Sequence, residues 1–263
     1  MYSEEHKLYL KKQIIYKWII IGIQLFFILL FLFLWQILSE KEIINPFIFS
    51  SPKRVLETIV KLHKNQTLYN HIGITVYETL ISFGIGTILG YFIASILWWW
   101  RSLYDIFDPF LTVLNSLPKV ALGPIIIIWA GAGINSIILM ALFISVIITI
   151  IHIYQGFKEV DLIKIRLMKS LGASKFQLYS KLMIPATFPN FISTLKVNIS
   201  LTLIGVIMGE FLVSKEGIGY LIMYGSQVFN LNLVITGIFL LGIVAAIMYY
   251  FVCFIEKRLI KND

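Results

Sequence analysis

The sequence predicts an all-α, polytopic membrane protein that crosses the bilayer six times. Apolar residues make up 59% of its 263 residues and charged residues only 14%, whereas soluble domains carry about 25% charged residues. Long stretches contain no Lys, Arg, Asp or Glu, among them residues 18–39, 79–100 and 120–157. A helix needs about 20 residues to cross a hydrocarbon core about 30 Å thick. Each stretch can therefore span the bilayer, and the third has room for more than one crossing.

The expected spans are residues 18–39, 77–100, 110–130, 134–156, 188–212 and 232–255. The third and fourth are divided at Gly131-Ala132-Gly133, because glycine permits a tight turn. The first run exceeds the apolar region of about 7–15 residues in a signal peptide, and no small-residue cleavage pattern follows it, so we expect it to stay as the first helix. Residues 1–263 are expected to form one transmembrane domain, with an N-terminal helix at 18–39 and a core at about 73–255.

Lysine and arginine indicate the orientation of these spans. With six crossings, fourteen of the 22 Lys and Arg residues lie on the side of the two termini and six on the other. Basic residues favour the cytoplasmic side, so both termini and the loop at 157–186 are predicted to be cytoplasmic. The net charge of +8 is spread over segments that flank the spans. This distribution favours the lipid bilayer as a partner and gives no indication of nucleic acid.

The loop at 157–186 is the one long charged interruption between apolar spans. Val160, Ile163, Leu167 and Leu171 recur at helical spacing before Gly172, and the glycine is suited to the left-handed cap that ends a helix. A second apolar pattern follows the glycine, at Phe176, Tyr179, Leu182 and Met183. Two short amphipathic helices of this kind either insert into a groove of a partner protein or rest on lipid headgroups. Amphipathicity alone leaves both interpretations open.

Within this loop, Ser170-Leu171-Gly172-Ala173-Ser174, then Phe176 and Ile184-Pro185, resemble the coupling loop of permease subunits of ATP-binding-cassette importers. That loop is typically Glu-Ala-Ala, three residues, Gly and, later, Ile-x-Leu-Pro. This chain departs from it, with Arg166-Leu167-Met168 in place of Glu-Ala-Ala and Leu182-Met183-Ile184-Pro185 in place of Ile-x-Leu-Pro.

The resemblance extends over most of the chain, and its other segments are similar to the nitrate, sulfonate and taurine permease branch. These segments are Asn45-Pro46-Phe47, Ser51-Pro52 with Val55-Leu56, Leu117-Pro118 with Pro124 and Trp129-Ala130-Gly131, and Glu210 followed by Gly217-Ile218-Gly219-Tyr220. Singly they are moderately specific. Their order and distances along the chain make the resemblance specific.

The resemblance implies the type I importer permease fold in a bacterial cytoplasmic membrane. It implies a cytoplasmic ATP-binding-cassette ATPase dimer as partner, a second permease subunit in a homodimer, and an extracytoplasmic substrate-binding protein. ATP would be bound by the ATPase subunits, so this chain would be a translocation subunit with no enzymatic activity and no cofactor of its own. The cargo of the branch is nitrate, sulfonate, taurine or a thiamine precursor.

Three sets of site residues follow. The expected ATPase-coupling residues are Leu167, Leu171, Gly172, Ala173, Ser174, Phe176, Tyr179 and Pro185. Lys119 and Glu210 are candidates for the translocation path because charges inside a membrane are costly, although Lys119 could instead snorkel to the cytoplasmic interface and Glu210 could be interfacial. Glu78, which opens the second span, is expected at the interface. No catalytic, cofactor-binding or metal-binding residue is predicted.

Several other functions are not indicated by the sequence. The chain has no GxxxxGK phosphate loop and is therefore not expected to be the ATPase. No convergent polar groups indicate a membrane enzyme, and no inverted repeat or midplane ion pair indicates a secondary carrier. The alternative is another importer subunit, the transmembrane coupling subunit of an energy-coupling-factor vitamin importer. Such subunits carry two long coupling helices, whereas this chain has a single short loop around Gly172, which favours the permease.

Overall fold

The structure is a computed structural model that describes residues 4–260, and every regular element in that range is a helix. The α-helices are α1 (Glu4–Glu40), α2 (Pro46–Phe49), α3 (Pro52–Lys64), α4 (Thr67–Trp99), α5 (Arg101–Ser116), α6 (Gly123–Ala130), α7 (Ile134–Lys158), α8 (Leu162–Ser170), α9 (Lys175–Leu178), α10 (Ile184–Val213), α11 (Ile218–Gln227) and α12 (Leu231–Ile260). A 3₁₀ turn at Lys119–Leu122 precedes α6, and a π-helical turn at Tyr179–Met183 joins α9 to α10.

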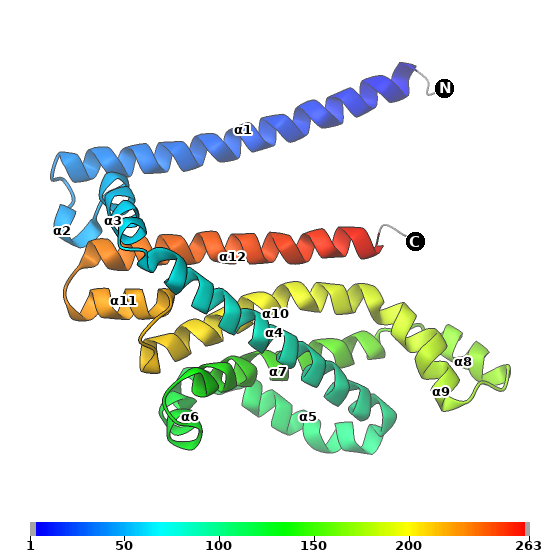
Figure 1. The fold of residues 1–263 in the computed structure, drawn as a ribbon. Helices are drawn as coiled ribbons and strands as arrows, with labels where there is room; N and C mark the ends of the chain where they lie inside the picture. The colour runs from blue at the N-terminus through cyan, green and yellow to red at the C-terminus, as the bar shows by residue number, and fades with distance from the viewer. Residues whose placement is uncertain (1–3, 261–263) are drawn as a thin grey trace.

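Within the described residues, five helical segments are long and apolar enough to cross a membrane, namely Lys11–Glu40, Thr67–Trp99, Ile134–Lys158, Lys175–Val213 and Leu231–Arg258. A sixth crossing is present if α5 and the segment Lys119–Ala130, which meet at 90°, count as one broken span. The described ends of α1 and α12 lie at the same end of the molecule as α8 and α9 (Figure 1). The all-α, polytopic prediction is confirmed.

The expected third span, residues 110–130, is broken in the structure. Leu117 has an extended backbone, with ψ of 140°, and Pro118 follows it. Proline disfavours a helical conformation in the residue before it and cannot donate to a helical hydrogen bond. The helix therefore stops at Ser116, and the chain turns before α6 begins.

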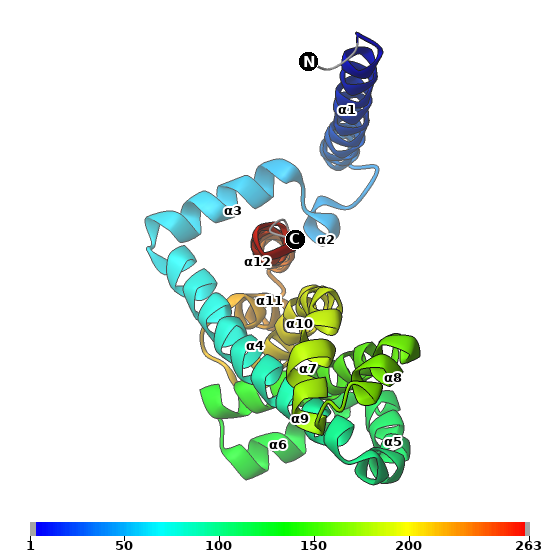
Figure 2. The same ribbon diagram turned by 90° about the vertical axis from the view of Figure 1, so that its right-hand side faces the viewer.

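The core of the bundle consists of α4, α7 and α10, which pack along one another (Figure 2). Small residues allow this close approach. A Cβ on Gly205 of α10 would meet the backbone of Ala141 in α7, and a Cβ on Gly90 of α4 would meet the side chain of Thr149 in α7. Packing through small residues is how membrane helices gain dispersion contacts without a hydrophobic driving force.

Helix α1 lies apart from this core (Figure 1), and none of its most apolar window is buried. Only its last turns are fastened to the chain: Trp35 donates to the carbonyl of Phe49 at 3.2 Å, and Ser39 donates to the carbonyl of Ser50 at 2.9 Å. The apolar surface of α1 is therefore free to face lipid or another protein.

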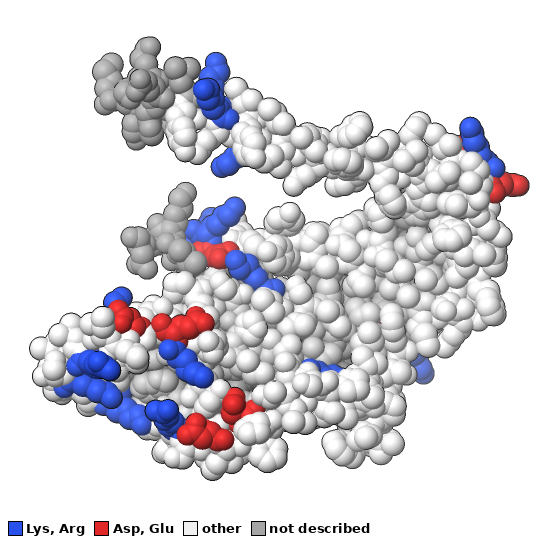
Figure 3. Space-filling model, turned by 180° about the vertical axis from the view of Figure 1, so that it is seen from behind, with Lys and Arg blue, Asp and Glu red and all other residues white. Residues whose placement is uncertain are grey.

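Charged side chains gather toward the ends of the molecule. Figure 3 shows Lys and Arg concentrated at the end that carries both termini and the α8–α9 segment, with a broad uncharged band beside it. A band of this kind is the surface expected to face hydrocarbon.

Candidate functional site: the α8–α9 loop and the two ends of α4

The α8–α9 loop, residues 157–186, is held in shape by capping interactions. Asp161 caps α8 by accepting from the backbone N–H of Ile163 at 2.8 Å. Gly172 ends the helix in the left-handed conformation, with φ of 79°, as the helical pattern predicts. Ser174 and Gln177 then form a reciprocal capping box at the start of α9. The two-helix prediction is confirmed, and the loop is a defined unit of structure.

Large apolar side chains of this loop are exposed, among them Ile163 (74% exposed), Leu167 (58%), Leu171 (73%) and Phe176 (67%). We call them the exposed apolar set. Basic side chains lie between them in the sequence, at Lys164, Arg166 and Lys169, and these are also exposed. Apolar side chains presented on a charged, projecting loop are typical of a surface that a partner covers.

The remaining predicted coupling residues divide by position. Gly172, Ser174 and Pro185 are exposed and Ala173 is half-buried. Tyr179 differs from them, because its hydroxyl donates to Ser95 Oγ of α4 at 2.6 Å and its ring lies 5.0 Å from that of Trp98. Tyr179 therefore anchors the loop to its own chain.

Lys175 adds a second anchor at the same end of α4. Its Nζ donates to the carbonyl of Trp99, at the C-terminus of that helix, and lies 5.5 Å from the centre of the Trp99 ring. A cation at a helix C-terminus is favourable, because the last carbonyls have no partner within the helix. The inner end of α4, by which we mean Ser95–Trp99, is thus joined to the loop.

The opposite end of α4 makes a second, fully buried set of contacts with the turn that follows α10. Thr75 donates to Glu210 Oε1 at 2.6 Å and accepts from the N–H of Ile218 at 2.8 Å. Glu210 Oε2 also accepts from the N–H of Gly219. We call this group, with His71, the outer clamp.

His71 completes the clamp. Its Nδ1 accepts from the N–H of Gly217 at 3.0 Å, and its ring stacks on Tyr220 at 6.0 Å. Because Nδ1 accepts, the ring proton must be on Nε2 in this arrangement. Sequence reasoning did not find His71 or Thr75, since their partners lie more than 130 residues away along the chain.

Two of the predicted charged residues are buried in the folded chain. Glu78, on α4, is 3% exposed. Glu210 is 1% exposed, and its carboxyl is enclosed by α4 and the 217–219 turn. The place of Glu210 on the translocation path stays a prediction. The sequence signal for this arrangement is Gly217-x-Gly219, because a Cβ at either glycine would meet the Glu210 side chain.

Lys119 lies at the bend between α5 and α6, half-buried, and its Nζ donates to the carbonyl of Asn115 at 2.8 Å. It thereby satisfies one of the free carbonyls at the C-terminal end of α5. Arg101 begins α5 at the other end of that 16-residue helix, which is about 24 Å long at 1.5 Å per residue. The structure does not bring Lys119 together with Glu210 in one site.

Taken together, these features define an integral membrane subunit, a helical bundle in which one projecting loop presents apolar side chains and is fastened to a core helix. The chain belongs to the family described as binding-protein-dependent transport system inner membrane component, whose pattern matches residues 86–261. It is accordingly a multi-pass, inner-membrane permease component of a binding-protein-dependent ABC importer.

Individual relatives are similar over most of the chain. The aliphatic sulfonates transport permease protein SsuC of Bacillus subtilis is 25% identical over 228 residues, covering 87% of this chain and 83% of the relative. The formylaminopyrimidine transport permease protein ThiX of Halalkalibacterium halodurans is 27% identical over 194 residues, covering 74% and 77%. The taurine transport system permease protein TauC of Escherichia coli is 22% identical over 233 residues, covering 86% and 84%.

Solved structures have the same fold. A chain of the inward-facing MetNI methionine ABC transporter matches with a TM-score of 0.67 and 17% identity, covering 76% of this chain and 97% of that one. A chain of a bacterial ABC transporter for the acidic polysaccharide alginate matches with a TM-score of 0.65 and 13% identity, covering 95% and 98%. The importer permease fold is therefore confirmed.

Proposed function

We propose that this permease is driven by a cytoplasmic ATP-binding-cassette ATPase that docks on the α8–α9 loop. The observation that carries the proposal is the exposed apolar set, held on a capped two-helix unit and tied to α4 through Tyr179 and Lys175. A rigid-body displacement of the loop would act directly on α4, which is how a small movement at one interface becomes a domain rearrangement. The loop and both termini are then cytoplasmic, as the basic residues favour.

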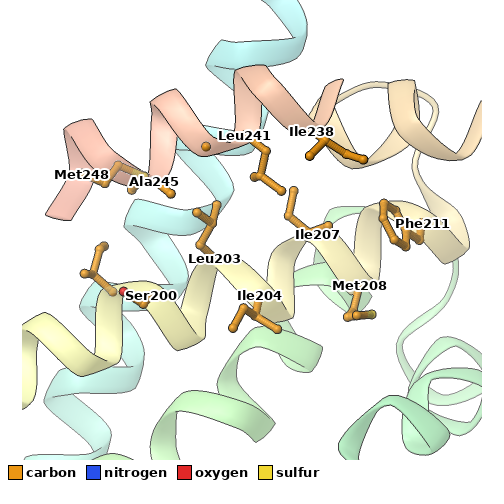
Figure 4. Close-up of a pocket in the computed structure, with 12 residues that line it drawn as sticks. Ser200, Leu203, Ile204, Ile207, Met208, Phe211, Ile238, Leu241, Ala245 and Met248 are labelled. Atoms are coloured by element: carbon orange, nitrogen blue, oxygen red, sulfur yellow. The ribbon is translucent and has the colours of Figure 1, made fainter. Parts of the chain in front are cut away.

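The second permease subunit is proposed to be another copy of this chain. Two apolar surfaces support this proposal. One is α1, whose side chains are exposed over residues 11–31. The other is an apolar groove of about 560 Å³ between α10 and α12, lined by Leu203, Ile207, Leu241 and Met248 among others (Figure 4). Burying such surfaces against a second copy gives each chain helix–helix contacts that a single copy lacks.

The cargo is proposed to be a small polar organic solute of the sulfonate, taurine or thiamine-precursor class, delivered by an extracytoplasmic binding protein. The support is the similarity to SsuC, TauC and ThiX over 74% or more of the chain. Lys119 is retained as a candidate for the translocation path, because a cation beside the break in the third span could attract an anionic cargo.

Co-purification tests the docking proposal. The tagged chain is expressed with candidate ATPase subunits and extracted in detergent, and the ATPase recovered per permease is measured for the wild type, Leu171→Glu and Lys164→Ala. Leu171→Glu should abolish recovery, because it places a charge in the centre of a desolvated contact. Lys164→Ala is the matched control on α8 and should retain most of it.

An equal yield of ATPase with wild type and Leu171→Glu would overturn the docking site. Cargo is tested separately, by uptake of taurine, an alkanesulfonate and formylaminopyrimidine into vesicles that contain the permease, its ATPase and its binding protein. Uptake of none of the three, in vesicles where the binding protein stimulates ATP hydrolysis, would refute the cargo class while leaving the docking site in place.

A further inference from the structure

A polar pocket opens at the outer end of the bundle, where α4, the start of α7 and the turn after α10 meet. Its volume is about 730 Å³, and its lining includes Glu78 of α4, Gly133 before α7, and Lys215 and Glu216 of the turn. The groove between α10 and α12 is lined by apolar side chains, whereas this pocket presents charges of both signs. Ligand sites have volumes of about 300–1,000 Å³, so the pocket is large enough for a small organic solute.

Glu78 lies at the floor of this pocket. The residue borders the pocket but is only 3% exposed, whereas Lys215 and Glu216 are exposed and so lie at the rim. Glu78 Oε2 accepts no hydrogen bond from any described residue, and Glu78 forms no ion pair with one. A buried polar group without a partner is costly. The floor therefore lacks a hydrogen-bond donor that a bound solute could supply.

Two other parts of the lining attract an anion. Helix α7 begins at Ile134, and Gly133 at its N-cap has no side chain to cap the first N–H groups. The N-terminus of a long helix carries a partial positive charge, and its free N–H groups can bind an anion. Lys215 adds a full positive charge at the rim and forms no ion pair with another described residue. The pocket thus combines an anion site with an acidic floor.

Hydrogen bonds hold the walls of the pocket in place. Ser214 Oγ accepts from the N–H of Glu216 at 3.1 Å and donates to the carbonyl of the same residue. The outer clamp holds the next residues, Gly217–Gly219, against α4. A Cβ on Gly133 would meet nothing within 4 Å, so the backbone before α7 borders open space. A pocket that is already formed loses little conformational entropy when a solute binds.

We propose that this pocket binds a small zwitterionic solute, with its ammonium group at Glu78 and its anionic group at Lys215 and the start of α7. The inference rests on the proposed function and narrows the cargo to a solute that carries both charges, such as an aminosulfonate. An alkanesulfonate fills the anion site but leaves Glu78 without a donor. A site built to hydrogen-bond one group of a solute discriminates against an analogue that lacks the group.

Ligand-observed NMR titration of the purified full-length permease, without its ATPase, tests the pocket. The probes are taurine, which carries both charges, ethanesulfonate, which carries only the anion, and ethylamine, which carries only the cation. Taurine should bind about tenfold or more tightly than either of the others, because it alone supplies a partner to both sites.

Two variants separate the two sites. Glu78→Gln keeps the size of the side chain and removes its charge, so it should lower the affinity for taurine about tenfold and leave that for ethanesulfonate unchanged. Lys215→Gln should weaken the binding of both. Glu57→Gln and Lys61→Gln are the matched controls, because both residues are exposed on α3 outside the pocket, and neither change should affect binding.

Ala132→Trp is a further variant that leaves the buried floor unchanged. Ala132 is exposed in the lining, so a tryptophan there narrows the pocket and should also weaken taurine binding. A wild-type permease that binds taurine no better than ethanesulfonate would overturn the inference. Taurine binding that neither Glu78→Gln nor Ala132→Trp weakens would do the same.

Vesicle uptake keeps this inference distinct from the proposed function. Uptake of taurine by a permease whose taurine binding does not depend on the pocket residues would remove the pocket and leave the cargo class in place. Binding of taurine that is lost in Glu78→Gln, without uptake of any proposed cargo, would leave the pocket in place and remove the cargo class.

Discussion

The two ends of α4 are fastened to the rest of the chain by different chemistry. At the inner end, Tyr179 and Lys175 of the loop contact Ser95–Trp99 through aromatic packing and two hydrogen bonds at a partly exposed edge. At the outer end, the contacts of the clamp are buried and almost entirely polar. The groups that contact one another at the inner end are partly exposed, whereas those at the outer end are buried.

This difference indicates what each end can tolerate. Aromatic packing is non-directional enough to persist through small displacements, which suits a loop proposed to move with an ATPase. Buried hydrogen bonds have narrow geometric requirements, and breaking one leaves a group unsatisfied. We therefore expect the inner end to behave as an adjustable joint and the outer end as a fixed one.

The largest expected effect is the difference in stability between alanine variants of two glycines with positive φ, one near each end of α4. Gly217→Ala should destabilise the protein by about 2–6 kcal/mol, from backbone strain of about 1–3 kcal/mol and a clash with the Glu210 carboxyl of about 1–3 kcal/mol. Gly172→Ala, at φ of 79° with nothing within 4 Å of the new Cβ, should cost about 1–2 kcal/mol. Unfolding midpoints of the two purified variants measure the difference, and equal midpoints would contradict it.

The next effect is the loss of one hydroxyl at the outer end. Thr75→Val keeps the shape of the side chain but leaves both Glu210 Oε1 and the N–H of Ile218 without a partner. Each buried group left unsatisfied costs about 1–3 kcal/mol, so the midpoint should fall by at least about 2–4 °C for each kcal/mol lost. Thr112→Val is a control, because Thr112 is exposed and donates only to a carbonyl of its own helix. A Thr75→Val protein as stable as this control would mean that the clamp does not hold the turn.

A smaller effect is expected from the matching change at the inner end. Tyr179→Phe removes the hydroxyl that donates to Ser95 but retains the ring beside Trp98. A partly exposed hydrogen bond is worth about 0.5–1.5 kcal/mol, and Ser95 still has the carbonyl of Tyr91 as a partner. The midpoint should fall by only a few degrees. A loss as large as that of Thr75→Val would remove the distinction between the two ends.

The sequence predicts the features that local pattern determines. Uncharged runs locate the spans because hydrocarbon excludes charge, and Gly172 was correctly placed at a helix end because few other residues adopt its backbone conformation. The break at Leu117-Pro118 follows from an equally local rule.

The outer clamp could not be predicted in the same way. Thr75 and Glu210 are 135 residues apart, and the sequence around each residue does not indicate which residue it will contact. Glu78 shows the difficulty clearly. Its place in the sequence, at the start of an uncharged run, indicates an interface, whereas its side chain is buried in the packed bundle. Whether a charged residue at the edge of a span is buried or exposed is determined by tertiary packing.

The smallest effect on stability is expected beyond the inner joint, at the exposed apolar set. Leu167→Ser should change the free energy of unfolding by no more than about 0.5 kcal/mol, because the side chain is 58% exposed and packs little within its own chain. The same change should weaken ATPase binding about tenfold or more, since a residue in the centre of an interface contributes about 1.4 kcal/mol or more. Thermal unfolding measures the stability of the variant, and titration of the same preparation with the ATPase measures its binding affinity. If Leu167→Ser lowered the midpoint as Tyr179→Phe does, the exposed set would belong to the joint itself, and the loop would have no surface reserved for a partner.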